Sequence, residues 1–497
     1  MKKIFAFILA SVGFAAFTAC TGVLDTDPLN EPSESVFWQN RGHFESALAA
    51  CYNGMQEQML TWVMPTFDAL TDNCYGNPGS TYVYNADQIQ TDNFDASTTG
   101  LIANVYSQCY SAISRINSFL DRLKVYTGED LSSVRDQFEG EALFLRSYCY
   151  YMLWLFYGDV PYVSESVTID TQDQPKVDKE TLYSNILSDL DDAIRKMGDQ
   201  TYMATGHATR GAARGLKARM LMYHAYGTDG AVANRAEVQE AYDLISQIKG
   251  YSLDPEYAKI FRPGDQQSSK EIIFSIKFLN PDNYHQMDSQ YGNYGMISPV
   301  QDLIDCYESE DIRLLKSIAV SEDPSVLYYQ WEGGEVVPIS SSTIGKRMVK
   351  WLAPFYKAGD RWTQTTRSDQ DIIYLRWGEL MLLQAEAANE LGKTAEAEGL
   401  VNQIRKRAGV GVCPGGMGQA EMRSYIRDER RRETPFEMIR IYDMRRWHIM
   451  DKLNGLVLDP YLKDVKTAWT ASREYWSIPQ GQIDLSDNIL IQNPNYK

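Results

Sequence analysis

The stretch DIIYLRWGELMLLQAEAANELG (371–392) and the stretch TAEAEGLVNQIRKRAG (394–409) follow one another and decide the fold. Apolar and small residues recur in both at intervals of three and four, the spacing of one face of an α-helix. Each stretch ends in a glycine, Gly392 or Gly409, where the end of a helix favours a residue with positive φ. The two stretches therefore predict a helical hairpin, two helices joined by a short turn.

The same pattern occurs earlier in the chain. TRGAARGLKARMLMYHAYG (209–227) is followed by NRAEVQEAYDLISQIKG (234–250), with Gly227 and Gly250 at the expected helix ends. Tandem helical hairpins of this length are typical of TPR-like units, which stack side by side and bury a shared core. We predict a mainly α fold with four TPR-like hairpins, near 42–125, 135–197, 209–250 and 371–409.

Long irregular stretches separate the expected hairpins, at 64–100, 251–370 and 410–497. Loops of that length inside a compact domain usually carry function or small elements of their own. EIIFSIKF (271–278) is rich in β-branched and aromatic residues and predicts one short strand. We expect a single domain over 35–497, a helical scaffold that carries ligand-binding insertions at 62–100 and 251–370.

The start of the chain predicts export and anchoring. Three residues with two lysines precede an apolar run over 4–17, which has the length of a signal peptide and is too short for a comfortable membrane span. FTAC (17–20) resembles a bacterial lipobox, whose cysteine carries lipid after cleavage; ordinary secretory cleavage beside a cysteine is the alternative. Two or more lipid chains anchor a protein stably. We predict a signal peptide over 1–19, lipidation of Cys20 and a polar tether over 20–34.

The composition argues against a nucleic-acid partner and does not decide whether the cysteines form disulfides. The chain carries a formal net charge of −18, so it repels phosphate backbones and we expect no nucleic-acid partner. The six cysteines after Cys20 contain no C-x-x-C pair, so a zinc or redox motif has no support. Export permits disulfides, but a chain of 497 residues does not need them, and buried free thiols fit equally well.

The sequence contains few signals of catalysis. The sequence has no G-x-S-x-G, H-E-x-x-H or P-loop motif and no EF-hand pattern for calcium. Acids and bases alternate at helical spacing in RDERRRETPFEMIRIYDMRRW (427–447), which fits either general acid–base work or an ion-pair network between helices; we favour the network. We predict no catalytic residue, no metal and no cofactor.

Asp159 and His224 are of residue types that can be catalytic, but the sequence around each of them does not favour that role. Gly158, followed by Asp159 and Pro161, is typical of a helix end, so Asp159 is not expected to be catalytic. His224 lies on an apolar helical stretch and is expected to be a core histidine with its hydrogen bonds satisfied.

Two insertions combine aromatic rings with amide and carboxylate side chains, as binding of sugar without chemistry requires. A Tyr or Trp ring stacks on the apolar face of a sugar, while Asn, Asp, Gln or Arg bonds its hydroxyl groups. Loops are also where binding residues concentrate, although such loops could instead be plain polar surface or contact a partner. The candidate ligand-binding residues are Trp62, Asp72, Asn73, Tyr75, Tyr82, Tyr84, Tyr284, Tyr291, Asn293, Tyr294 and Trp331.

A series of motifs carries a family resemblance. LDTDP (24–28) follows the lipobox, and RSYCYYMLWLFYGDVPY (146–162) contains Arg…Tyr-Gly-Asp-Val-Pro. The stretch 427–447 contains Glu-Arg…Asp…Arg-Trp, and QNPNYK (492–497) ends the chain. In this order, over nearly the whole length, these motifs resemble the SusD/RagB family of surface lipoproteins. Departures from the family patterns occur at Thr434, Met438 and Asn495.

The resemblance implies four TPR-like units, a ligand site in the variable insertions and a lipid-anchored position on the outer face of the outer membrane. It implies a SusC-like, TonB-dependent barrel transporter as partner, which the lipoprotein covers as a hinged lid. The implied function is non-catalytic binding of an oligosaccharide or polysaccharide for uptake. A peptide-binding lid of a similar importer, a TPR-type assembly protein and a hydrolase are the alternatives, and loops rich in Tyr, Asn and Gly favour sugar over peptide.

Overall fold

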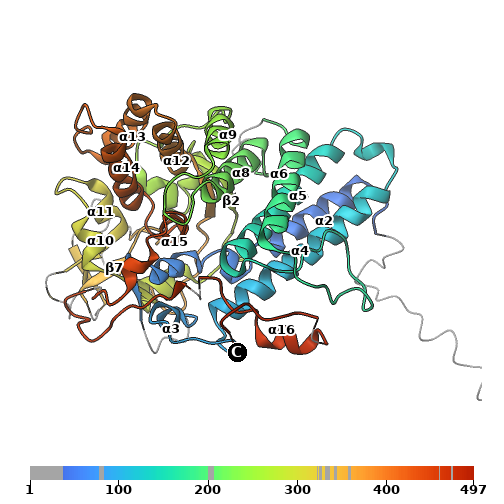
Figure 1. The fold of residues 1–497 in the computed structure, drawn as a ribbon, viewed down its shortest axis with the longest axis horizontal. Helices are drawn as coiled ribbons and strands as arrows, with labels where there is room; N and C mark the ends of the chain where they lie inside the picture. Colours follow the sequence, from blue (N-terminus) through green and yellow to red (C-terminus); the bar gives the residue numbers. More distant parts are fainter. Residues whose placement is uncertain are drawn as a thin grey trace, which may run out of the picture.

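The computed structural model describes most of the chain (Figure 1). The described residues are 37–77, 83–199, 206–321, 323, 327–330, 336–340, 344–355, 360–457, 459–471, 474–487 and 489–496, with the backbone alone for 327–330 and 336–340. The predictions that lie outside them are the signal peptide over 1–19, Cys20 and the tether over 20–34, Tyr82 and Trp331.

Long helices form a chain of neighbours, each packed against the next in sequence order. They are α2 (Arg41–Gly54), α4 (Leu101–Val125), α5 (Arg135–Tyr157), α6 (Lys179–Lys196), α8 (Arg210–His224), α9 (Arg235–Ser246), α12 (Trp377–Glu390) and α13 (Thr394–Ala408). The series runs from the right of Figure 1 to its upper left, and α9 contacts α12 although a long insertion separates them in sequence. The predicted mainly α fold is confirmed.

The helix ends follow local chemistry, with one exception. Gly392 has φ 83° and Gly409 has φ 76°, so both take the positive φ that was predicted for them. The same prediction for Gly227 is wrong, because α8 ends before it and the next loop turns at Gly230, which has φ 70°. A Cβ on Gly230 would lie 2.4 Å from the carbonyl oxygen of Trp447, so close packing as well as φ selects glycine there.

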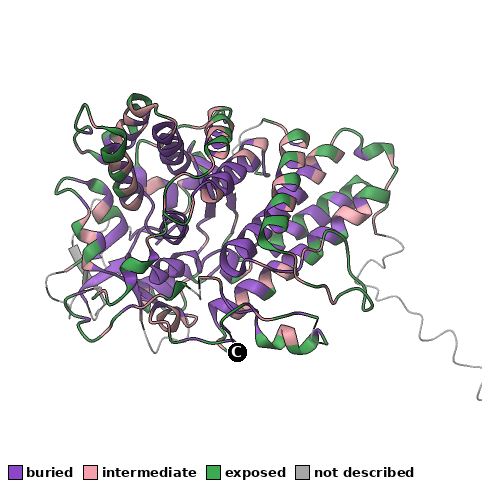
Figure 2. Cartoon of the chain, in the orientation of Figure 1, coloured by how far each residue is buried: buried purple, intermediate pink, exposed green. Residues whose placement is uncertain are grey.

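Two helices lie almost wholly in the interior, as Figure 2 shows. In α5 nearly every residue from Gly140 to Tyr157 is buried, and the helix ends at Gly158 with φ 70°, which confirms the predicted helix end. In α12 every residue after Trp377 is buried. A helix that is covered on all sides carries apolar residues around its whole circumference. The charged side chains that these two helices also bury are paired, Arg146 with Asp189 and Glu386 with Arg446.

The strands of the described residues are short and pair two by two. The predicted strand is present as β2 (Ile272–Ile276), which pairs antiparallel with β8 (Ile372–Arg376). Because β2 opens and β8 closes the long insertion, their pairing brings its two ends together. The chain then enters α12, where the Trp377 amide donates to the Glu271 carbonyl at 2.8 Å. The insertion therefore leaves the helical scaffold and returns to it at one place.

The remaining elements lie mainly in the insertions and the C-terminal part. The other strand pairs are β1 (Cys74–Gly76) with β3 (Ile297–Pro299), β4 (Ile318–Val320) with β7 (Lys346–Met348), and β5 (Leu327–Gln330) with β6 (Val336–Ser340). The other α-helices are α3 (Ala86–Gln90), α10 (Gln301–Asp305), α11 (Ile312–Ser317), α14 (Gln419–Glu433), α15 (Ile439–Arg446) and α16 (Gln480–Leu485). Within the described part of the chain, no helix has the length and apolar character needed to cross a membrane.

Candidate ligand-binding surface

The candidate residues come from two tyrosine-rich segments, 62–88 and 280–295, which the pairing of β1 with β3 brings together. Strand β1 follows the first segment's Asp72-Asn73, and β3 follows the second segment directly; the two strands pair with Cys74 opposite Pro299 and Gly76 opposite Ile297. One residue further on, the Asn77 amide donates to the Met296 carbonyl at 3.2 Å. A single short antiparallel ladder thus joins parts of the chain more than 200 residues apart.

A π-helical turn, η6 (Asp288–Asn293), shapes the second segment. The Asp288 carboxylate is buried and accepts hydrogen bonds from the Ala353 amide and the Ser368 hydroxyl, both at 2.8 Å. Burial raises the pKa of Asp288 to about 6, and these hydrogen bonds lower it only in part. The turn is therefore fixed to the 353–370 segment by a buried polar contact.

His285 makes a second fixed contact between the same two segments. Its Nε2 donates to the Gln370 carbonyl at 3.0 Å and its Nδ1 accepts from the Met287 amide at 3.3 Å. Burial lowers the pKa of His285 to about 4. The ring is thus neutral at physiological pH and acts as a structural hydrogen-bonding group rather than as a proton carrier.

Two of the predicted tyrosines present their rings to solvent on this framework. Tyr284 is 42% exposed and Tyr294 is 47% exposed. The Arg367 guanidinium lies 4.6 Å from the centroid of the Tyr284 ring, and the Tyr294 hydroxyl donates to Gln364 Oε1 at 3.0 Å. Asn293 lies between the two tyrosines in the sequence and is half-buried. Flat rings therefore stand beside planar polar side chains.

Tyr84 brings the first segment to this surface. It is half-buried, has φ 52°, and its hydroxyl donates to Gln58 Oε1 at 2.7 Å. The Val63 amide donates to the Gln58 carbonyl at 3.1 Å, and the hydroxyl of the buried Tyr291 donates to the Val63 carbonyl at 3.3 Å, so Gln58 and Val63 link Tyr84 to the π-helical turn. Beside Tyr84 is a recess of about 480 Å³ whose lining is polar, formed by Asn85, Gln88, Asp92, Asn93, Phe94, Asp95, Ser97, Thr98 and Thr99.

Five predicted ligand-binding residues are placed in the interior instead. They are Trp62, Asp72, Asn73, Tyr75 and Tyr291. The Tyr291 hydroxyl is 2.7 Å from the Thr66 hydroxyl, and the Asn73 amide donates to Asp68 at 3.0 Å. Trp62 and Tyr75 pack into apolar clusters. These side chains support the surface from below and do not belong to it.

Asp72 is the clearest of these corrections. Arg440 Nη2 lies 2.5 Å from Asp72 Oδ2, and Arg440 Nε lies 2.7 Å from Oδ1. Burial alone would raise the pKa of Asp72, but the guanidinium groups of Arg440 and Arg431 hold it below its usual range. The carboxylate is buried and bound in a bidentate ion pair with α15, so it is not presented to a ligand at the surface.

The sequence did not identify Trp362, which the structure places under the π-helical turn. A Cβ on Gly292 would lie 2.6 Å from Trp362 Cδ2. The Trp362 Nε1 donates to the Ala353 carbonyl at 2.9 Å, and the ring packs against Phe355 with centroids 4.4 Å apart. The signal available in the sequence was a single tryptophan in the polar stretch 360–370.

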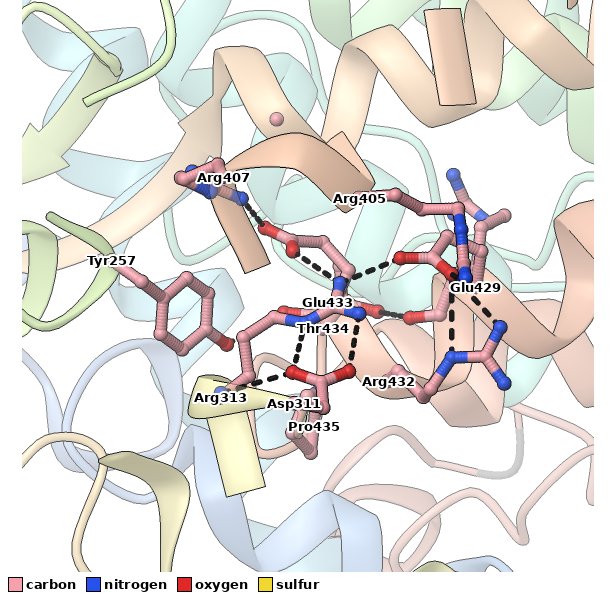
Figure 3. Close-up of polar contacts among 12 residues, drawn as sticks. Tyr257, Asp311, Arg313, Arg405, Arg407, Glu429, Arg432, Glu433, Thr434 and Pro435 are labelled. Atoms are coloured by element: carbon pink, nitrogen blue, oxygen red, sulfur yellow. Dashed lines mark hydrogen bonds and ion pairs between the residues drawn. The ribbon is translucent and has the colours of Figure 1, made fainter. Parts of the chain in front are cut away.

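The alternating charges of 427–447 form the predicted ion-pair network, shown in Figure 3. Glu433 pairs with Arg313 at 2.9 Å, with Arg376 at 2.7 Å and with Arg407; Glu429 pairs with Arg313 at 2.8 Å. Burial alone would raise the pKa of Glu433, but Arg407, Arg376 and Arg313 hold it well below the usual range. Both carboxylates are buried and ionised, so neither can donate a proton to a ligand at neutral pH.

Among the described residues, no group of three His, Cys, Asp or Glu side chains is placed to hold a metal ion. Metal binding therefore has no support in this part of the chain. The described cysteines are free thiols. The site that the structure brings together is thus a surface of rings and polar side chains over a fixed framework.

Comparisons with known proteins agree with this fold. A family model described as the SusD family matches residues 257–496, and one described as starch-binding associating with outer membrane matches residues 24–222. SusD-like protein P2 of Formosa agariphila is 24% identical to this chain, over 95% of this chain and 96% of its own length.

Solved structures superpose over nearly the whole chain. A SusD-like protein of Bacteroides fragilis has a TM-score of 0.76 at 23% identity, covering 95% of this chain and 100% of that one. Surface glycan-binding protein A of Bacteroides fluxus has a TM-score of 0.72 at 21% identity, covering 92% and 100%. These structures show the fold, and the two family models, which together match 24–222 and 257–496, show that the chain belongs to the SusD/RagB family.

Proposed function

We propose that this protein binds an oligosaccharide or polysaccharide without cleaving it and delivers it to a TonB-dependent transporter of the outer membrane. The observation that carries the proposal is the pair of solvent-exposed rings, Tyr284 and Tyr294, held beside Arg367 and Gln364. An exposed ring offers the apolar face on which a sugar ring stacks, and the neighbouring planar groups offer hydrogen bonds to hydroxyls.

The surrounding surface supports a hydroxyl-rich ligand. The polar recess beside Tyr84 is lined by amide, hydroxyl and carboxylate groups with almost no apolar area. Such a lining suits a sugar better than an apolar peptide side chain, which would gain little by entering it. The proposed ligand surface therefore consists of Tyr84, Tyr284, Asn293 and Tyr294 from the predicted set, together with Gln364 and Arg367, and Tyr82 and Trp331 stay predictions.

The proposal includes a non-catalytic role. Glu429 and Glu433, the carboxylates that could suggest acid–base work in 427–447, are buried in ion pairs with Arg313. The family description names binding and association with the outer membrane, and the similar protein of Bacteroides fluxus carries the name of a glycan-binding protein. These names support a binding role for this chain as well.

The proposed location is the outer face of the outer membrane. The predicted signal peptide over 1–19, lipidation of Cys20 and the tether over 20–34 would attach the domain there. The first described residues, Phe37 and Trp38, pack against the start of α2, with their ring centroids 4.9 Å apart. The tether over 20–34 would therefore end just before the packed part of the domain begins at Phe37.

Calorimetry of the purified mature domain against a panel of glycans and peptides tests the ligand. We expect at least one glycan to bind and Tyr284→Ala and Tyr294→Ala each to weaken it by about tenfold, about 1.4 kcal/mol. Tyr284→Phe and Tyr294→Phe are the matched controls, because they keep the ring; they should retain most of the affinity. Binding of peptides and of no glycan would replace the proposal with a peptide importer.

A further inference from the structure

A buried arginine contacts the turn that carries Tyr294. Arg347 is the middle residue of β7, at the left of Figure 1, and is only 4% exposed. Strand β7 pairs with β4 and also packs against the π-helical turn η6. Burial lowers the pKa of Arg347 to about 10, so its guanidinium stays charged at neutral pH. A positive charge is therefore enclosed in the protein next to the proposed ligand surface.

The guanidinium binds the carbonyl end of η6. Its Nη1 donates to the Gly292 carbonyl at 2.8 Å and lies 3.4 Å from the carbonyl oxygens of Tyr291 and Asn293. These three residues are the last of the turn. Carbonyl groups at the end of a helical turn have no next turn to bond and carry partial negative charge, so a cation is favourable there. Arg347 therefore holds the end of the turn by charge-assisted hydrogen bonds.

The same contact holds the peptide group that leads into Tyr294. The oxygen of that group is the Asn293 carbonyl, which Arg347 binds, and its nitrogen is the Tyr294 amide, which donates to the Ser289 carbonyl at 3.0 Å. Because a peptide group is planar, fixing both of these atoms fixes its plane. On the other side of Tyr294, Gly295 has φ 62°, and a Cβ there would lie 2.6 Å from Arg347 Cζ. The backbone on both sides of Tyr294 is thus held against one guanidinium.

We propose that Arg347 is a positioning residue of the ligand surface, which sets the direction of the Tyr294 ring through the backbone of the turn and touches no glycan itself. The inference rests on the proposed function, because the direction of the ring affects binding only if the ring contacts the glycan. The competing explanation is that Arg347 stabilises the fold and has no effect on the site. The two differ in one respect: a positioning residue affects affinity only while the Tyr294 ring is present.

A double-mutant cycle measured by calorimetry tests this role, with the glycan of the panel that the wild type binds most tightly as the probe. Arg347→Met should weaken binding by about tenfold, as much as Tyr294→Ala, because both take the ring out of its place. In a Tyr294→Ala background, Arg347→Met should change the affinity by less than about twofold. Equal losses in the two backgrounds, or no loss in either, would overturn the proposal.

Two further variants separate positioning from a loss of folding. Arg347→Lys keeps the charge without the planar fork, so it should lose only about threefold in affinity, and it carries the cycle if Arg347→Met does not fold. Lys346→Met is the matched control, because Lys346 is the next buried cation of β7 and donates to Asp459 at 2.7 Å instead. It should lower Tm and leave the affinity within about twofold of the wild type. Equal loss of affinity in Lys346→Met and Arg347→Met would assign the effect to the strand and not to Arg347.

Hydrogen exchange of the free protein adds a measurement that needs no glycan. Arg347→Met should speed exchange by about fivefold or more in peptides that cover 288–296, while peptides from α5 keep the wild-type rate. Unchanged exchange in 288–296 would overturn the proposal. If the wild type binds glycan and the cycle shows no coupling, the positioning role is wrong and the proposed function stands. If the wild type binds no glycan, the proposed function fails and the positioning role fails with it.

Discussion

Arg376, the residue that ends β8, and Glu433, the residue that ends α14, form an ion pair at 2.7 Å in the interior of the protein. Arg376 also pairs with Glu271 at 2.7 Å and with Glu437 at 2.7 Å. Glu271 precedes β2, so the arginine sits where the long insertion leaves and rejoins the helical scaffold. The pair with Glu433 joins the two ends of the insertion to the C-terminal helices.

Glu433→Gln should destabilise the protein strongly. Arg376, Arg313 and Arg407 would each lose one carboxylate partner while staying buried, and breaking a buried pair typically costs about 3–5 kcal/mol. Urea unfolding at pH 7 measures the loss. Asp428→Asn is the control, because Asp428 lies exposed on the same helix and its change should stay within about 0.5 kcal/mol. Equal stability of Glu433→Gln and wild type would mean that Glu271 and Glu437 are sufficient partners for the buried Arg376.

The helices were the most predictable part of the molecule, because periodicity and end residues are local signals. The stretches 371–392 and 394–409 contain helices α12 and α13, with Gly392 and Gly409 in the expected conformation. The start of 371–392 was wrongly predicted as helix, because Ile372–Arg376 pairs with β2 as strand β8. Gly227 shows the limit of such rules, because a glycine near a helix end need not be the residue that turns the chain. Its loop uses Gly230 instead.

The candidate surface was only partly predictable, because burial within a loop depends on distant parts of the chain. Tyr291 and Tyr294 are the same residue type three positions apart, yet one is fully buried and the other is 47% exposed. The π-helical turn and its contact with Trp362 decide which ring points inward. Nor does any local pattern foretell that Cys74 pairs opposite Pro299.

Asp72→Asn should lower stability while leaving glycan affinity unchanged. The variant removes the bidentate pair with Arg440 and leaves that guanidinium buried, at a cost of about 3 kcal/mol at pH 7. Because the pKa of Asp72 is depressed in the folded state, its stabilisation is present above the unfolded pKa near 4 and is lost as the pH falls. The difference between wild type and variant in urea unfolding should therefore begin to shrink only as the pH falls below about 4. A large loss of affinity with intact stability would return Asp72 to the ligand site.

Gly292→Ala should disturb the tyrosine surface from beneath. The added Cβ would meet the Trp362 ring at 2.6 Å, and an overpacked position of this kind costs about 1–3 kcal/mol. We expect a lower Tm together with weaker glycan binding, because the turn that carries Tyr294 must shift. Gly411→Ala is the control, since a Cβ there meets nothing within 4 Å. Unchanged binding and Tm in Gly292→Ala would show that Trp362 moves aside freely.

His224 should make the stability of the bundle depend on pH, because it is clamped between two carboxylates rather than enclosed in the core as its apolar helix suggested. Its Nδ1 lies 2.8 Å from Glu237 of α9 and its Nε2 lies 2.8 Å from Glu180 of α6. Both ring nitrogens donate only when the imidazole is charged. The hydrogen bond to Glu237 raises the pKa of His224, burial opposes this, and Glu180 raises it further.

A folded-state pKa above the unfolded value near 6.5 gives stability that is fully present below that value and is lost as the pH rises through the folded pKa. Wild type should therefore lose stability in urea between about pH 6 and pH 8, and His224→Gln should show a shallower slope. Some slope should remain, because Glu141 raises the pKa of His207 in the same way. His448→Gln, at an exposed position, should follow the wild-type curve. If His224→Gln also follows the wild-type curve, the clamp between α6 and α9 contributes nothing to folding, and other groups such as His207 and the buried Asp288 account for the slope.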